Sequence, residues 1–165
     1  MIGTIVDQEV FEELLKQKFP NIMDHLESKN LPLAVITTKW FMCLFIGAVP
    51  SETLLRIWDL FFFHGSPVII TTALSLIKMY ESEIMKVTST EEFMSYSTTL
   101  GMNCYDVDRL FNIAFNVVGL IDNRHLNYIR ARYWEATKEY LEDENKKRDF
   151  YILERSSHCK YMKNF

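Results

Sequence analysis

Apolar residues recur every three or four positions along most of this chain, and the apolar–polar alternation typical of strands is nearly absent. Side chains at the longer spacing line one face of an α-helix, whereas alternating side chains line one face of a strand. The first helical stretch ends at Pro20, and its apolar positions are Val10, Phe11, Leu14, Leu15 and Phe19. The sequence therefore predicts an all-α fold, an irregular helical bundle of about seven helices.

Capping residues and helix breakers give the expected boundaries of these helices. Asp7, either Thr37 or Thr38, Ser51, Ser89 and Asp106 are the expected N-caps, and Gly65 is the expected left-handed residue after a helix. The predicted helical segments span residues 7–19, 22–30, 38–48, 51–64, 68–87, 90–100, 107–118 and 123–149. No structure is assigned to the tail after residue 150. A solenoid of stacked helix pairs is the competing architecture, although no internal repeat of fixed period is found.

Residues 54–65 form a nearly wholly apolar segment that carries one cation, Arg56, and one anion, Asp59. Side chains three positions apart are neighbours on a helix surface, so the guanidinium can meet the carboxylate. A surface ion pair on an amphipathic helix is one interpretation, and such pairs contribute little to stability. The rest of the segment is aliphatic or aromatic, which leaves the helix little polar surface. We therefore expect the pair to be at least half buried and to fix the local geometry.

Charge and composition exclude several classes of protein. The net charge of -4 and the pI near 5.6 provide no basic field for binding nucleic acid. Charged residues interrupt the apolar stretches before they reach the ~20 residues of a bilayer span, so no transmembrane segment is expected. The N-terminal residues show no secretory signal pattern. Three widely spaced cysteines, Cys43, Cys104 and Cys159, are typical of free thiols in a reducing cytoplasm, which is the expected location.

No motif for a cofactor, a metal or catalysis is found. The five glycines are dispersed, so no glycine-rich loop can hold a phosphate. The histidines lack the close spacing of zinc ligands. His64 and His125 are expected at helix termini, where compensation of the helix dipole accounts for them. We therefore expect no cofactor, no metal site and no catalytic residue.

An ordered set of residues nevertheless runs through the third and fourth predicted helices. The set comprises Trp40, Phe41, Leu44, Phe45, Pro50, Arg56, Ile57, Trp58, Asp59 and Gly65. In this order and spacing it resembles the W-F-x-x-L-F, P, R-I-W-D and G signature of the TBC domain, the helical module of Rab GTPase-activating proteins. The resemblance is specific over residues 31–83 and covers most of the chain. It implies that residues 1–165 are the C-terminal part of a Rab-GAP TBC domain and share the fold of its C-terminal subdomain.

The resemblance also implies a partner and a mechanism. TBC domains act on Rab-type small GTPases in vesicle trafficking, and they supply an arginine and a glutamine from the motifs I-x-x-D-x-x-R and Y-x-Q. An arginine supplied in trans accelerates GTP hydrolysis by about 10³–10⁵. Neither motif occurs here, and Gln8 and Gln17 do not follow a tyrosine at the required spacing. The chain is therefore expected to be a structural, Rab-groove subdomain without activity alone, peripheral to endomembranes through its Rab, and its ten signature residues are expected to be structural.

Two other functions remain open. One is a free-standing helical adaptor that binds partner proteins through an apolar groove. The other is a hydrolase, which would require a histidine within hydrogen-bond reach of Cys43, Cys104 or a serine.

A half-domain also leaves apolar faces without cover, and large exposed patches tend to bind a partner. We therefore expect self-association or an exposed patch near the first helix, Val6–Phe19.

Overall fold

The computed structural model describes the backbone of residues 2–162 and the side chains of residues 2–148. Within this range the chain forms nine α-helices and one π-helical segment, and no strand. They are α1 (Ile2–Lys18), α2 (Pro20–Ser28), α3 (Ala34–Met42), α4 (Ser51–His64), α5 (Pro67–Met79), α6 (Glu81–Ile84), α7 (Thr90–Ser97), α8 (Val107–Asn112), η1 (Ile113–Val118) and α9 (Asn123–Met162). The all-α prediction is confirmed. The final residues of the tail, 163–165, lie outside the described range.

Helix α5 is the central element of the bundle. Every residue from Pro67 to Ile77 is buried, including Thr71, Thr72 and Ser75. A helix that is apolar on all sides is stable only when other elements surround it. Helices α1, α4 and α8 and the segment η1 all contact α5, and a single cluster of buried apolar side chains joins them. The helices therefore pack around one core, as the bundle prediction requires.

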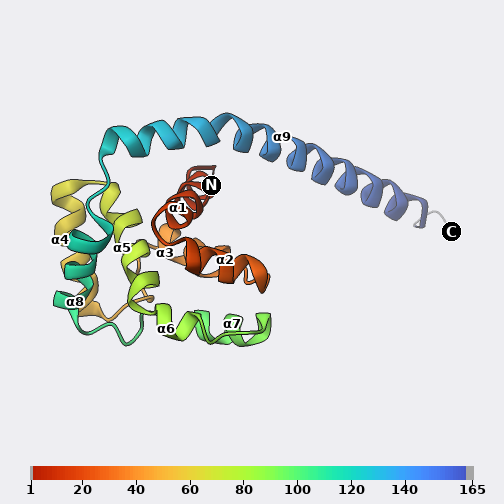
Figure 1. The fold of residues 1–165 in the computed structure, drawn as a ribbon. Helices are drawn as coiled ribbons and strands as arrows, with labels where there is room; N and C mark the ends of the chain where they lie inside the picture. Colours follow the sequence, from red (N-terminus) through yellow and green to blue (C-terminus); the bar gives the residue numbers. More distant parts are fainter. Residues whose placement is uncertain (1, 163–165) are drawn as a thin grey trace.

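Helix α1 is covered by the C-terminal helix. The two lie against each other in Figure 1, where α9 crosses above α1 and then extends beyond the body of the molecule. The Arg130 guanidinium donates to the Asp7 carboxylate at 2.6 Å and to the Ser66 hydroxyl at 2.9 Å. Arg132 forms a second ion pair, with Glu13. The two ion pairs join residues that are 123 and 119 positions apart, and the Arg130–Ser66 hydrogen bond spans 64 positions.

The prediction of an exposed patch near α1 is wrong. Five apolar side chains of this helix are at most 2% exposed, namely Val6, Val10, Phe11, Leu14 and Leu15, and the two others, Ile2 and Ile5, are partly buried. Helices α2, α3, α5 and α9 all contact α1. The sequence did not reveal this cover because it comes from Leu126 and Ile129 of α9, which are distant in the chain and fully buried here.

Several helix boundaries differ from the expected ones. Helix α1 begins at Ile2, so Asp7 lies inside the helix and binds Arg130 instead of capping. Helix α3 begins at Ala34, and the expected cap Thr37 donates its hydroxyl to the Leu33 carbonyl at 3.2 Å within that helix. Ser51 is the first residue of α4 and makes no capping hydrogen bond. Asp7 and Thr37 each bind another partner, which local sequence rules do not exclude.

Other capping predictions are confirmed. The Ser89 hydroxyl accepts a hydrogen bond from the Glu92 amide at 3.2 Å, and the Glu92 carboxylate reaches back to the Thr88 amide. The Asp106 carboxylate accepts from the Arg109 amide at 2.9 Å at the start of α8. Both arrangements satisfy amides that the first turn of a helix leaves without partners.

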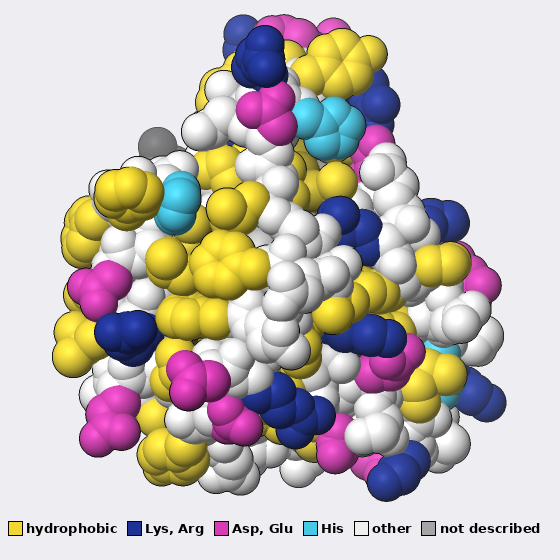
Figure 2. All heavy atoms as spheres, turned by 60° about the vertical axis from the view of Figure 1, so that its left-hand side comes forward, with side chains coloured by type: hydrophobic (Ala, Val, Ile, Leu, Met, Phe, Trp, Pro, Cys, Tyr) yellow, Lys and Arg dark blue, Asp and Glu magenta, His cyan; other side chains and the backbone are white. Residues whose placement is uncertain are grey.

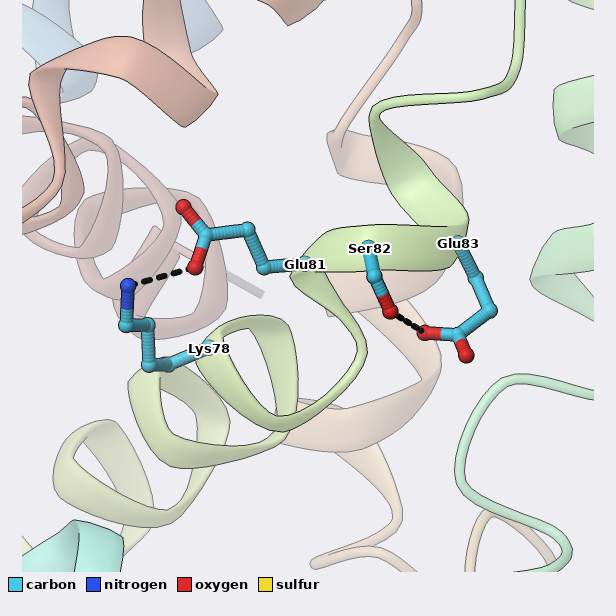
Figure 3. Close-up of polar contacts among 4 residues, drawn as sticks. All are labelled: Lys78, Glu81, Ser82 and Glu83. Carbon is cyan, nitrogen blue, oxygen red and sulfur yellow. Dashed lines mark hydrogen bonds and ion pairs between the residues drawn. The ribbon is translucent and has the colours of Figure 1, made fainter.

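The expected helix over residues 68–87 is interrupted at Tyr80, between α5 and α6. Figure 3 shows the polar contacts at this junction, where the Lys78 ammonium group points toward the Glu81 carboxylate. The same ammonium group lies 5.1 Å from the centre of the Phe19 ring, next to the end of α1. Lys78 therefore connects the end of α1 to the bend between α5 and α6. The Ser82–Glu83 hydrogen bond in the same view is 2.9 Å long and lies on the exposed side.

Within the described residues, no helix combines the length and the apolar character that a membrane span requires. The long helix α9 is strongly polar.

Candidate functional site

The ten signature residues lie on α3, on α4, in the turn between them and, for Gly65, directly after α4. The side chains of Trp40, Phe41, Phe45 and Ile57 belong to the core. Leu44, Pro50, Trp58 and Gly65 are partly buried. Arg56 and Asp59 are exposed. The signature therefore builds a frame that presents one face of α4 to solvent.

The turn between α3 and α4 has an unusual backbone. The helix that was expected to reach Ala48 ends at Met42, and residues 43–49 form consecutive turns. Leu44 and Phe45 have φ angles of 46° and 66°, in the left-handed region that side chains other than glycine seldom adopt. The Phe45 ring is nevertheless fully buried and lies 5.7 Å from the Trp40 ring. The unfavourable backbone angles at Leu44 and Phe45 therefore occur together with complete burial of the Phe45 ring.

Helix α4 holds this turn through Trp58. The Trp58 indole N–H donates to the Leu44 carbonyl at 3.0 Å. The Lys39 ammonium group donates to the Gly47 carbonyl at 2.7 Å from the other side. Strained conformations persist where surrounding contacts determine them, and these two hydrogen bonds are such contacts. The tryptophan of the R-I-W-D sequence thus links α4 to the end of α3.

Replacing Trp58 with phenylalanine is expected to lower the free energy of unfolding by about 1–3 kcal/mol, because the Leu44 carbonyl loses its donor. Denaturant unfolding followed by circular dichroism measures this change. Trp134→Phe is the matched control, because Trp134 is 42% exposed and donates none of the hydrogen bonds found among the described side chains. Equal stability of the Trp58→Phe variant and the wild type would contradict the role of Trp58.

The outer face of α4 consists of Glu52, Leu55, Arg56, Asp59, Phe62 and Phe63, all exposed. Leu55 is 60% exposed, Phe62 78% and Phe63 82%. The spacing of these residues, i, i+3, i+4, i+7, i+10 and i+11, places them on one stripe. The opposite side of the helix carries the buried Thr53 and Ile57. Figure 2 brings this side of the molecule forward and shows hydrophobic side chains grouped among acidic and basic ones.

The expected buried ion pair between Arg56 and Asp59 is therefore wrong. Both side chains are exposed, and no ion pair or hydrogen bond joins either of them to another side chain within residues 2–148. The prediction took the apolar content of the segment as a sign of burial. Phe62 and Phe63 are apolar but lie outside, on the same stripe as the charges. The helical spacing of that stripe was visible in the sequence and could have identified an outward face.

A loop after α7 borders the start of α4. The Thr53 hydroxyl donates to the Cys104 carbonyl, and Gly101 lies against the Ala48 carbonyl. Met102 and Tyr105 of this loop are 44% and 68% exposed, next to a buried Cys104. The loop therefore fixes the entry of α4 from outside and leaves apolar side chains near it.

The thiols show no sign of catalytic activation. Burial raises the pKa of the Cys104 thiol to about 11, which opposes formation of the reactive thiolate. Its sulfur lies 3.8 Å from the Met79 sulfur. Burial also raises the pKa of the neighbouring Tyr80 hydroxyl to about 12. Cys43 is exposed, and the side chain of Cys159 lies outside the described range.

Both glutamines are hydrogen-bonded to other side chains of the chain. The Gln8 amide donates to the Thr38 hydroxyl at 2.5 Å, between α1 and α3. The Gln17 amide donates to the Glu13 carboxylate at 3.1 Å on the surface of α1. Among the described side chains, no group of three histidine, cysteine or acidic residues is arranged to hold a metal ion.

A separate open depression of about 450 Å³ lies between α1, α2 and α9. Its walls carry Glu9, Glu12, Glu13 and Glu27, and no signature residue lines it. Burial, with the nearby Glu9 and Glu27 carboxylates, raises the pKa of Glu12. The depression is therefore mainly acidic. The outer face of α4, in contrast, carries acidic and basic side chains next to exposed apolar ones.

Comparison with known proteins shows the family to which the chain belongs. Residues 1–85 match the family described as Rab-GTPase-TBC domain. The chain is 32% identical over 157 residues to TBC1 domain family member 2B of Xenopus tropicalis, covering 95% of this chain and 17% of that protein. It is 44% identical over 86 residues to Growth hormone-regulated TBC protein 1 of Xenopus tropicalis, covering 52% of this chain and 25% of that protein.

A solved structure supports the same assignment. The crystal structure of the Chlamydomonas flagellar RabGAP TBC domain superposes with a TM-score of 0.61 at 28% identity, over 64% of this chain and 36% of that chain. Over the described residues the chain thus has the all-helical fold of a TBC domain. It belongs to the Rab-GTPase-TBC domain family, as the signature in its sequence predicted. The chain spans only 17% of the length of the TBC1 domain family member 2B that it matches.

Proposed function

We propose that this chain is the C-terminal part of a Rab GTPase-activating domain and that it does not accelerate GTP hydrolysis alone. Membership of the Rab-GTPase-TBC domain family supports a Rab-type GTPase as the partner. The observation that carries the second part is the absence of both I-x-x-D-x-x-R and Y-x-Q from the sequence. The ten signature residues then act as a frame for the GTPase-binding groove. We place the protein in the cytoplasm, at membranes that carry its Rab in vesicle trafficking.

The exposure of Arg56 changes one argument for this proposal. A buried, paired guanidinium would have been unable to reach a nucleotide, but Arg56 is exposed. A catalytic role of Arg56 would also require a glutamine that orients the attacking water. The two glutamines of the chain lie elsewhere: Gln8 is hydrogen-bonded to Thr38, and Gln17 lies on the surface of α1. A Rab-GAP reaction needs charge neutralisation and orientation of the attacking water together. Arg56 supplies at most the first of these.

Single-turnover GTP hydrolysis by a panel of Rab proteins tests the proposal. The 165-residue chain is expected to change the rate by less than about tenfold, which corresponds to about 1.4 kcal/mol in the barrier. A TBC domain that carries both motifs serves as the positive control. Stimulation well above tenfold that is lost in the Arg56→Ala variant and retained in the Arg124→Ala variant would identify Arg56 as a catalytic arginine and would overturn the proposal.

A further inference from the structure

The outer face of α4 combines features that seldom remain exposed in a monomer. Leu55, Phe62 and Phe63 are 60%, 78% and 82% exposed, within less than three helical turns. Contiguous apolar surface of this kind marks an interaction site more often than it remains in contact with water. The face lies on a helix that is held near its start by the Thr53–Cys104 hydrogen bond and near its middle by the Trp58–Leu44 hydrogen bond.

The charges on this face indicate what covers it. Arg56 and Asp59 carry one charge of each sign on the same stripe, and neither has an ionic partner within residues 2–148. A face of one sign would repel a second copy of itself. The neighbouring cation and anion, Arg56 and Asp59, are complementary to those of a second copy when the two helices run antiparallel, and the further acid of the face, Glu52, then lies at the edge of the contact, opposite Phe63. Isologous twofold interfaces use this kind of self-complementarity.

The register of such a pairing follows from the positions. Two antiparallel α4 helices related by a twofold axis between Ile57 and Trp58 place residue i of one copy opposite residue 115 minus i of the other. Arg56 then faces Asp59 of the second copy, and the contact occurs twice because of the symmetry. Leu55 lies near Phe62 of the second copy, offset by two positions from exact opposition, while Phe63 covers the methylene groups of the opposite Glu52. Helix axes packed 8–10 Å apart allow these contacts.

We propose that α4 is a self-association surface, through which two copies of this chain pair antiparallel with reciprocal Arg56–Asp59 ion pairs. The apolar side chains supply the buried area, and the charges select the register and the partner. Other occupants of this face, such as a GTPase or a further part of a TBC domain, would not require the two charges to be matched to each other. The inference is independent of whether the chain stimulates GTP hydrolysis.

Sedimentation velocity of the 165-residue chain over a wide range of concentrations tests the proposal. The wild type is expected to show a monomer–dimer equilibrium. Arg56→Glu and Asp59→Arg are each expected to weaken dimerisation by at least about tenfold, because each places like charges opposite each other twice. Both positions are exposed, so these variants remain folded, which circular dichroism verifies.

Mixing the two variants gives the decisive measurement. In a mixed dimer, Glu at position 56 of one copy faces Arg at position 59 of the other, and the natural Arg56 faces the natural Asp59. The mixture is therefore expected to associate although each variant alone does not, and the double variant is expected to regain self-association. Phe62→Ala should weaken dimerisation, whereas Met94→Ala, which removes a 45% exposed side chain on α7, should not. A wild type that remains monomeric, or a dimer unaffected by either charge reversal, would overturn the proposal.

Discussion

Replacing Trp40 with alanine is expected to lower the free energy of unfolding by about 3–5 kcal/mol. Trp40 is 2% exposed and packs against Phe45 in the core beneath α4. Removing an indole from a packed interior loses its transfer free energy and leaves a cavity that the neighbouring helices fill only in part. Equilibrium unfolding in urea gives the change, with thermal unfolding as a second measurement.

Trp134→Ala is the matched control for this prediction, because Trp134 lies on α9 and is 42% exposed. Its removal is expected to change stability by less than about 1 kcal/mol. If Trp40→Ala yields too little folded protein to measure, Trp40→Phe provides a smaller truncation at the same position. Similar effects at positions 40 and 134 would show that Trp40 is not the structural signature residue that the sequence predicts.

The second large effect is expected at Gly101, where alanine should lower the free energy of unfolding by about 2–4 kcal/mol. Gly101 has a φ angle of 90°, a conformation that side chains strain. A Cβ atom there would also lie 2.8 Å from the Ala48 carbonyl oxygen, so the backbone between α3 and α4 would have to move. Unfolding in urea measures the loss.

Gly119 separates the two causes. Its φ angle is 74°, but nothing lies within 4 Å of a Cβ atom built on it. Gly119→Ala therefore introduces the backbone strain without the close contact, and about 1–2 kcal/mol is expected. A Gly101→Ala variant no less stable than Gly119→Ala would show that the contact with Ala48 carries no cost.

Local chemistry predicted much of this fold. Asp106 caps α8 as expected, Ser89 and Glu92 form their capping box, and Gly65 ends α4 with a φ angle of 80°. Each of these features depends on a hydrogen bond or a backbone angle within a few residues. Such short-range terms are present in the sequence itself and need no knowledge of tertiary structure.

The turn after α3 could not be predicted in the same way. Left-handed angles at Leu44 and Phe45 contradict the preferences of both residues. They depend on Trp58, fourteen residues later, and on the burial of the Phe45 ring. Local preference favours a continued helix here, and packing between helices overrides it.

The helix that carries the R-I-W-D segment was predicted correctly, but the burial of its side chains was not. Apolar residues flank Arg56 on both sides in the sequence, and they carry no direct sign of which side of the helix faces the core. Thr53 and Ile57 face the core, whereas Phe62 and Phe63 face solvent. Hydrophobicity alone does not separate a residue buried in its own chain from one that awaits a partner.

The pairing of α1 with α9 has a consequence for biosynthesis. The residues of α9 that pack against α1 leave the ribosome after all the other helices described here. Until then the nascent chain carries an incompletely shielded N-terminal helix, a state that favours chaperone binding and aggregation. Closure of the domain also joins Asp7 to Arg130, a contact across 123 positions, and contacts between such distant residues slow folding.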